Sequence, residues 1–436
     1  MKICFLGAGS TVFAKNILGD CILTPELGEF EIALHDIDAQ RLDQSFRLIS
    51  AVNQKYGGKA KISRHLDRRE SLKGADFIVN AIQVGGYKPC TKTDFDIPKK
   101  YLLRQTIGDT LGIGGIMRGL RTIHVLEDIA KDIEELCPNA LFLNYTNPMA
   151  ILSGYLQTRT RVKAVGLCHS VQACVPGLLD MFGMKDKEEG CTWQIYGINH
   201  QAWLTELLDK DGNDLYPEIK ARSLSGKYPK RDLVRRELMH TFGYYVTESS
   251  EHNAEYTPYF IKDLYPGLIR KYKIPLDEYP RRCRHQIRDW KRNARRLDSG
   301  EILEHTRSHE YGSRIITAVV TDKPFFFHGN FSNASLLIPN LPPEACVEVP
   351  AAVDKSGFHP FKCPRLPEQC AALNRTNINV QLLTLRAAET RRIDDIIHAA
   401  ALDPHTASEL SLDDIKDMVK ELYKAHHKGG YLPEYK

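Results

Sequence analysis

Three short polar segments follow apolar runs of the kind that form strands, and they carry the side chains best suited to chemistry. They contain Asn147, then Cys168 with His169, and then His200, and the apolar runs before them span 141–145, 162–167 and 193–196. Cysteine and histidine serve as metal ligands and as acid–base groups. Strands that are parallel neighbours end at one edge of a sheet, so we expect these side chains to share one site.

Each of these residues also has a plain structural interpretation. A cysteine at a strand end is usually a small buried apolar group, and Asn147-Pro148 is a pair typical of turns. The spacing of Cys168 and His200 does not identify a metal, although the softness of a thiolate beside an imidazole favours zinc. Their joint placement after successive strands is what favours a functional site.

The chain opens with a dinucleotide-binding pattern. A short apolar run ends in Gly7-Ala-Gly9-Ser10, and a helical pattern begins at once. Gly7 allows a tight turn, Gly9 lets the backbone approach a pyrophosphate, and the amides that open the helix attract its negative charge. The third glycine of the usual pattern is replaced by Val12. Asp36 ends the second strand, where an acid accepts a hydrogen bond from a ribose 2′-hydroxyl, and this favours NAD over NADP.

The first 180 residues alternate strand patterns with helical ones. The strands are expected at 3–6, 31–34, 60–63, 77–82, 141–145 and 162–167, and the helices at 11–22, 39–54, 116–136 and 149–156. This alternation is typical of βαβ units and a mostly parallel sheet. We therefore predict an α/β protein whose residues 1–190 form a Rossmann-like, doubly wound NAD-binding domain.

The second half has a different pattern. Strands are expected at 193–196, 202–208, 325–328 and 347–349, and helices at 231–242, 276–312, 378–390, 393–401 and 412–426. Residues 191–436 should form an α+β domain for substrate, metal and oligomerisation. No tract rich in Gly, Ser or Pro separates the halves, so they should pack closely, with the active site between them.

Composition excludes several classes of protein. The 436 residues are 42% hydrophobic and 26% charged, with a formal net charge of +4, and no apolar run approaches a membrane span. The charge is too small and too dispersed to indicate nucleic acid or an anionic membrane as a partner. The start of the chain leaves no room for a signal peptide, and the eleven cysteines are expected to be reduced thiols, so we predict a cytoplasmic enzyme.

Longer motifs resemble those of glycoside hydrolase family 4, the NAD- and manganese-dependent glycosidases, and most of all its α-galactosidase members. The similarity extends over nearly the whole chain and is carried by segments 7–16, 35–38, 85–89, 109–115, 144–149, 166–172, 197–200 and 248–252. The segments Gly166-Leu-Cys-His-Ser-Val-Gln172 and Glu248-Ser-Ser-Glu-His252 are specific, unlike a lone Gly-x-Gly.

The resemblance implies roles for particular residues. Cys168 and His200 match the protein ligands of the divalent metal, normally Mn2+, and Asn147 matches the residue that contacts the sugar hydroxyls. His169 stands where several α-acting members carry the proton donor. Tyr256 is our candidate for the base that removes a proton from the sugar, with Glu251 as the alternative. The segment after Cys168 departs from that of the phospho-sugar members, so the substrate should carry no phosphate.

The implied reaction passes through redox chemistry, an exception to the usual pair of carboxylates. NAD+ takes a hydride from C3 of the galactosyl unit, and the metal polarises the resulting ketone. The base removes the C2 proton, the aglycone leaves from C1 with His169 as proton donor, and water adds. The hydride then returns to C3, so the net reaction is hydrolysis of terminal α-galactosides such as melibiose or raffinose.

Other functions remain open from sequence alone. One is another non-phosphorylated α-glycoside, a glucoside or a galacturonide, within the same family. Another is a dehydrogenase of the lactate or malate type, which would make NADH from a hydroxy acid, and a third is an NAD sensor without turnover. The resemblance further implies a dimer or tetramer.

Overall fold

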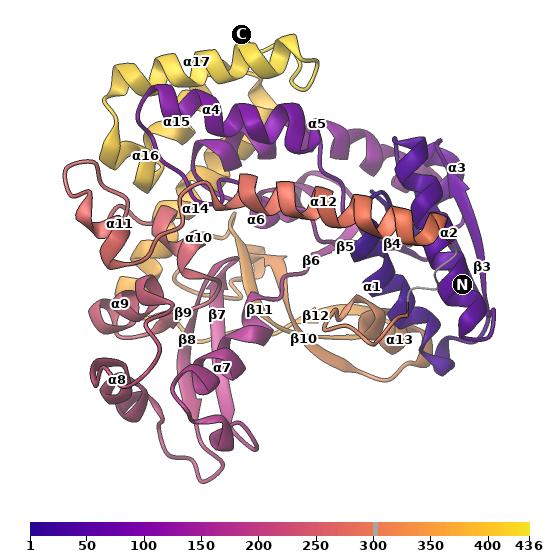
Figure 1. Cartoon of the computed structure of the whole chain (residues 1–436), viewed down its shortest axis with the longest axis horizontal. Helices are drawn as coiled ribbons and strands as arrows, with labels where there is room; N and C mark the ends of the chain where they lie inside the picture. The colour runs from indigo at the N-terminus through magenta and orange to yellow at the C-terminus, as the bar shows by residue number, and fades with distance from the viewer. Residues whose placement is uncertain (300–303) are drawn as a thin grey trace.

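A single twelve-stranded sheet runs through the part of the chain that the computed structural model describes, residues 1–299 and 304–436 (Figure 1). Its strands are β1 Lys2–Leu6, β2 Phe30–His35, β3 Ala60–His65, β4 Phe77–Asn80, β5 Leu141–Asn144, β6 Lys163–Gly166, β7 Thr192–Ile198, β8 Gln201–Leu208, β9 Tyr245–Val246, β10 Phe325–Ser332, β11 Cys346–Asp354 and β12 Gly357–Pro360.

The first six strands form the predicted doubly wound half. They lie in the order β3-β2-β1-β4-β5-β6, and every pair among them is parallel. This order reverses direction at β1 and β4, the place where open α/β sheets bind ligands beyond their carboxyl ends. The predicted fold class is confirmed, with the Rossmann-like order in the N-terminal half.

Antiparallel strands extend the sheet into the second half. β10 joins β6 through the pair Asn330–Gly166, and β11 joins β7 through the pair Glu348–Gly197. The hairpin of β7 and β8 and the short β9 complete the edge. The sheet is thus continuous across residue 190, the domain boundary expected from the sequence, and that boundary stays a prediction.

Helices cover both faces of the sheet. Their bounds are α1 Thr11–Ile22, α2 Ala39–Lys55, α3 Arg68–Leu72, α4 Lys92–Lys100, α5 Gly112–Leu136, α6 Met149–Arg159, α7 Ser170–Met181, α8 Tyr216–Leu224, α9 Leu233–Phe242, α10 Ser250–Glu255, α11 Gly267–Lys271, α12 Glu278–Asp298, α13 Gly312–Thr321, α14 Glu368–Thr390, α15 Ile393–Ala401, α16 Pro404–Glu409 and α17 Leu412–Lys428. Across the described ranges, none of them has the length and apolar character needed to cross a bilayer.

Two buried clusters lie on opposite faces of the parallel strands because successive side chains point to opposite sides. On β1, Phe5 packs with α1, α2 and α13, whereas Cys4 and Leu6 pack with α5 and α6. The second cluster also takes in α15 and α17 from the C-terminal end, which lie beside α5 and α4 along the top of Figure 1. The two halves of the chain therefore share a core.

One predicted helix is too long. The basic stretch 276–312 contains α12, but that helix ends at Asp298, residues 300–303 lie outside the described ranges, and 304–311 is not helical. Asp20 of α1 explains the loop, because its carboxylate accepts hydrogen bonds from the Ser308 backbone and the His305 ring. These tertiary contacts outweigh the local helical preference of the sequence.

Candidate functional site

The sheet brings two distant strand ends together. Cys168 follows β6 and His200 lies in the turn between β7 and β8. β10 and β11 lie between β6 and β7, and the bridging pairs at Gly166 and Gly197 align the two ends. The structure thus brings Cys168 and His200 close together, as the sequence led us to expect. The strands that align them are antiparallel, however, and not the parallel neighbours that we expected.

A third group, Glu248, completes a compact cluster with these two. One ligand atom from each of Cys168, His200 and Glu248 lies within 4.8 Å of the others, a spacing that suits a metal ion. Glu248 Oε2 lies 3.6 Å from His200 Nε2. Both residues have left-handed backbones, with φ of +64° each. Such strain in non-glycine residues concentrates at functional sites, where the surroundings hold it in place.

His200 is oriented by neighbouring side chains. Its Nδ1 lies 2.9 Å from the hydroxyl of Tyr256, and the two rings are nearly parallel, at 7°. His252 packs edge-on against the same imidazole, with 4.7 Å between centroids. With Nδ1 engaged by Tyr256, Nε2 is the nitrogen that faces Glu248. A hydrogen bond to the second ring nitrogen is how proteins fix the tautomer of a ligand histidine.

Burial and neighbouring charges shift the pKa values of Cys168 and Glu248. Burial, and then the Glu248 carboxylate, raise the pKa of Cys168 to about 11, so its thiol is protonated near neutral pH. Burial opposes ionisation of Glu248, but His252 and His200 nearby lower its pKa to about 2. A cation among these donors would favour the thiolate and keep the carboxylate ionised.

Three further residues predicted from the sequence, Tyr256, Glu251 and Asn147, have different surroundings. Tyr256 is fully buried, and burial followed by the charge of Asp109 raises its pKa well above 10. Glu251 is partly exposed at the start of α10, with Arg282 3.8 Å from its carboxylate. Asn147 follows β5, and its carbonyl accepts a hydrogen bond from Arg118 Nε at 3.1 Å.

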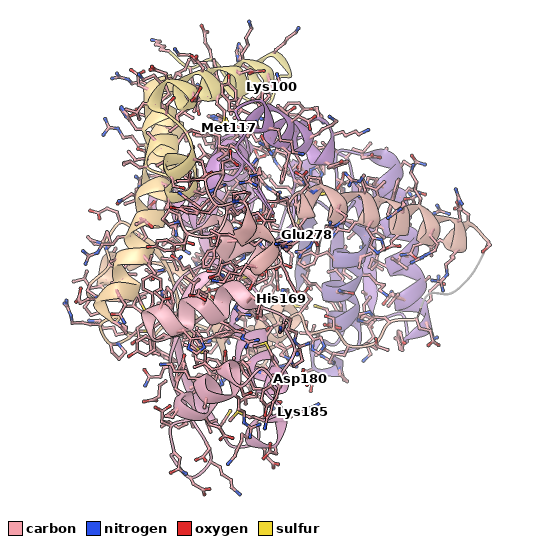
Figure 2. All side chains as sticks on the ribbon, turned by 60° about the vertical axis from the view of Figure 1, so that its left-hand side comes forward. Lys100, Met117, His169, Asp180, Lys185 and Glu278 are labelled. Carbon is pink, nitrogen blue, oxygen red and sulfur yellow. The ribbon has the colours of Figure 1, made fainter. Side chains whose placement is uncertain are left out.

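His169 contacts a different acid, Glu310. Its Nε2 lies 2.7 Å from Glu310 Oε2, and the side chain is 42% exposed (labelled in Figure 2). Burial opposes the charged imidazole, but the hydrogen bond and charge of Glu310 raise the pKa of His169 overall. The predicted proton donor is therefore a histidine paired with a carboxylate.

The dinucleotide pattern forms the predicted turn between β1 and α1. Gly7 has φ of +83°, and a Cβ there would lie 2.7 Å from the Ala81 carbonyl oxygen. The Gly9 amide donates to Asp36 Oδ2 at 2.6 Å, so Asp36 closes onto the turn. Ser10 precedes α1 without capping it through its side chain. The first amides of α1 thus remain available to a ligand anion.

Several residues around the cluster were not singled out from sequence. Glu248 lies in the segment Glu248-Ser-Ser-Glu-His252, for which the family resemblance implies no role at this residue, and Glu310 and Tyr311 lie in the stretch predicted as helix. Glu348 of β11 is fully buried, and burial followed by Cys168 raises its pKa well above the usual range. No periodicity marks these positions, since the antiparallel pairing that recruits them spans long stretches of chain.

Comparisons with known proteins find similar sequences over nearly the whole chain. The family 4 glycosyl hydrolase profile matches residues 2–184, and the profile of the family 4 C-terminal domain matches 195–406. The chain is 56% identical to an alpha-galactosidase of Bacillus subtilis over 436 residues, covering all of both chains. It is 33% identical to an alpha-galactosidase of Rhizobium meliloti, covering all of this chain and 89% of that protein.

A solved structure shares the fold. A 6-phospho-alpha-glucosidase from gut microorganisms, in complex with NAD and Mn2+, superposes with a TM-score of 0.81 at 21% identity, covering 100% of this chain and 99% of that one. The resemblance expected from the sequence motifs is confirmed over both halves. The chain belongs to the family 4 glycosyl hydrolases.

Proposed function

We propose that this protein hydrolyses terminal α-galactosides and uses NAD+ and Mn2+ as catalytic groups. The observation that carries the proposal is the cluster of Cys168, His200 and Glu248 in the same chain as the Gly7–Ser10 turn. The full-length similarity to two alpha-galactosidases supports the sugar. The other α-glycosides and the hydroxy-acid dehydrogenase are not favoured, because both of these relatives are alpha-galactosidases.

The donor set fits a divalent cation. A thiolate, an imidazole and a carboxylate together supply negative charge and three ligand atoms within 4.8 Å of one another, a donor set that suits a divalent cation. Ligand softness alone favours zinc at such a site. Manganese is proposed because the structural relative named above contains it.

The Gly7–Ser10 turn fits a dinucleotide. The space where a Gly7 Cβ would lie is filled by backbone, and the uncapped start of α1 offers amides to a pyrophosphate. Asp36 would meet the ribose at the end of β2. When bound, NAD+ supplies a hydride acceptor, and the metal supplies a Lewis acid that makes a neighbouring C–H acidic.

Each of the site residues then has its own role in the proposed reaction. Cys168, His200 and Glu248 hold the cation, and Asn147 orients the sugar through its hydroxyls. Tyr256, whose hydroxyl contacts His200, is the proposed base for the C2 proton, with Glu251 as the alternative. His169 gives a proton to the departing oxygen. Holding these groups in one geometry is the main contribution of the fold.

One assay tests the proposal directly. Hydrolysis of 4-nitrophenyl α-galactoside would be measured with NAD+, Mn2+ and dithiothreitol, and each component would then be left out in turn. We expect loss of activity without NAD+ or metal, and weak activity without the thiol reductant. Activity that survives both dialysis and a chelator contradicts the proposed chemistry, and preference for 4-nitrophenyl α-glucoside contradicts the sugar.

A second experiment tests the C2 proton. Product formed in D2O should carry deuterium at C2, and a substrate deuterated at C2 or C3 should show an appreciable isotope effect. Complete absence of both results would leave a mechanism with two carboxylates.

A further inference from the structure

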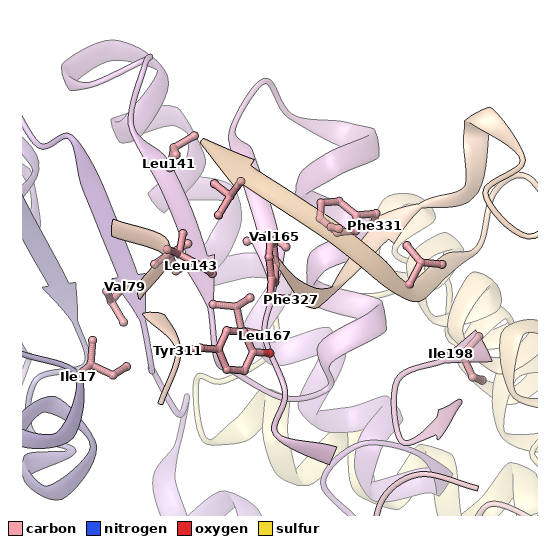
Figure 3. Packing of buried hydrophobic residues seen from close by; sticks show 14 of the residues in the cluster. Ile17, Val79, Leu141, Leu143, Val165, Leu167, Ile198, Tyr311, Phe327 and Phe331 are labelled. Atoms are coloured by element: carbon pink, nitrogen blue, oxygen red, sulfur yellow. The ribbon is translucent and has the colours of Figure 1, made fainter. Parts of the chain in front are cut away.

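Two consecutive residues before α13 contact two consecutive residues of the site. The Tyr311 hydroxyl accepts from the Cys168 backbone N–H at 3.0 Å and lies 2.8 Å from the Cys168 carbonyl oxygen. Glu310 Oε2 lies 2.7 Å from His169 Nε2. Figure 3 shows the Tyr311 ring beside Leu167, the residue that precedes Cys168. One short segment therefore holds both the metal ligand and the proposed proton donor.

Hydrogen bonds to Ser308 and to Asp20 of α1 hold this segment in place. The Glu310 amide donates to Ser308 Oγ at 3.1 Å, and Ser308 donates to the Asp20 carboxylate from its amide, at 2.9 Å, and from its hydroxyl, at 2.6 Å. Asp20 is fully buried on α1 and also bonds the His305 ring. The position of Glu310 is thus fixed by helix α1, which also begins at the dinucleotide turn.

In the pair of His169 and Glu310, the carboxylate is largely buried and the imidazole is partly exposed. The Glu310 side chain is 10% exposed, whereas that of His169 is 42% exposed. The Tyr145 and Tyr311 rings flank the imidazole, with centroids 6.4 Å and 6.1 Å away. Because Glu310 engages Nε2, the nitrogen left for a ligand is Nδ1. In other enzymes, a carboxylate that is hydrogen-bonded to one ring nitrogen of a catalytic histidine fixes the tautomer and the orientation of the imidazole in this way.

We propose that Glu310 is the positioning residue that aims His169 Nδ1 at the glycosidic oxygen. This inference rests on the proposed function. As the C1–O bond breaks, its electron pair stays on the departing oxygen, and the Nδ1 proton passes to that oxygen. The water that adds to the sugar returns a proton to Nδ1, so the protein ends unchanged. His169 Nε2 keeps its proton throughout and donates it in a hydrogen bond to the Glu310 carboxylate, which does not touch the substrate.

The test compares two leaving groups in the isosteric variant Glu310→Gln. The group that leaves melibiose is glucose, whose departing hydroxyl oxygen must be protonated, whereas 4-nitrophenyl α-galactoside releases a stable phenolate anion. General acid catalysis contributes roughly 10²–10⁴-fold. We expect kcat for melibiose to fall about 100-fold and kcat for the nitrophenyl substrate to fall less than about 5-fold.

Two further variants provide controls. Glu304→Gln changes an exposed acid of the same loop that pairs with Lys55, and it should leave both rates unchanged. Tyr311→Phe removes the contact with the Cys168 backbone and should slow both substrates to the same degree. Equal loss on both substrates in Glu310→Gln, or no loss on either, overturns the proposal. An inactive wild type overturns the proposed function instead.

A readout independent of turnover tests the hydrogen bond itself. Long-range proton–nitrogen NMR of histidine-labelled protein should show the His169 proton on Nε2 at pH 8, with the signal assigned by its loss in His169→Ala. Glu310→Gln should shift the population toward Nδ1–H. A wild-type signal already on Nδ1 contradicts the positioning role, whatever the activity is.

Discussion

The Gly7–Ser10 turn and the cluster of Cys168, His200 and Glu248 are built in opposite ways. Gly7, Gly9 and Asp36 belong to one β–α–β unit, and hydrogen bonds within that unit shape the turn. Cys168, His200 and Glu248 come from three separate segments that only the antiparallel strands align. A local motif carries its own geometry, whereas a composite site depends on strand register far from its residues.

The two regions also differ in charge chemistry. The turn offers backbone amides, which do not titrate, while the cluster includes a thiol whose pKa is about 11. Loss of a side chain, or a change of pH, should therefore act on metal binding and leave dinucleotide binding largely intact. Changes confined to one of the two regions would reveal whether the two kinds of binding are separate.

The largest effect is expected from Cys168→Ser. We expect Mn2+ affinity and turnover to fall on the order of 1,000-fold, beyond the roughly 10–100-fold typical when a residue that supports a ligand is lost. NAD+ binding, measured by protein fluorescence, should change less than about 3-fold, because it depends on the other region. Mn2+ binding would be measured by electron paramagnetic resonance.

The control is Cys191→Ser, which changes a partly exposed cysteine outside the cluster. It should behave as the wild type does. Full Mn2+ affinity in Cys168→Ser would show that the metal lies elsewhere.

The next effect concerns pH. Metal binding must displace the Cys168 proton, so Mn2+ affinity should rise about tenfold for each pH unit, or about 100-fold between pH 6.5 and 8.5. The sign follows from a thiol pKa of about 11, since the proton stays bound over this whole range until the metal removes it. Calorimetry in buffers of different ionisation enthalpy would count the protons.

NAD+ binding is the internal control and should release no comparable proton. A flat Mn2+ affinity over this range would mean that the sulfur is not a ligand.

A smaller effect is expected from Tyr256→Phe. This change removes the hydroxyl that contacts His200 Nδ1, so Mn2+ affinity should fall about 10–100-fold. Electron paramagnetic resonance titration separates this loss from the loss of a base, which affects turnover alone. Tyr259→Phe, at a half-exposed tyrosine nearby, is the matched control. Unchanged affinity would restrict Tyr256 to proton transfer.

The smallest effect is expected at the turn. A Cβ at Gly9 would lie 2.6 Å from Asp36 Oδ2, so Gly9→Ala must displace that carboxylate. We expect NAD+ affinity to fall about tenfold, equivalent to about 1.4 kcal/mol, with Mn2+ affinity unchanged. Gly177→Ala, where a Cβ meets open space, serves as control. A parallel loss of Mn2+ affinity in Gly9→Ala would show that the two regions are coupled.

Most of the parallel half could be predicted from the pattern of residues. The expected bounds of α1, 11–22, agree with the structure, and so do those of α15, 393–401. The order of β1, β2 and β4 follows from alternation and right-handed crossovers. These features depend on periodicity and short connections, which a sequence displays directly.

Residue patterns gave wrong or no predictions where long-range contacts determine the local structure. Residues 304–311 lie in a loop because Asp20 of α1 holds Ser308 and His305. The strand pairs at Asn330 and Glu348 likewise link segments with no shared local signal.

By itself, the sequence determined a dinucleotide turn at Gly7–Ser10 and a cysteine and two histidines after strands. Local hydrogen bonding and strand alternation are enough for that. Only the tertiary structure decided that Glu248 joins Cys168 and His200, and that Glu310 holds His169. The reason is that strand register, not spacing along the chain, sets which side chains meet within a few ångströms.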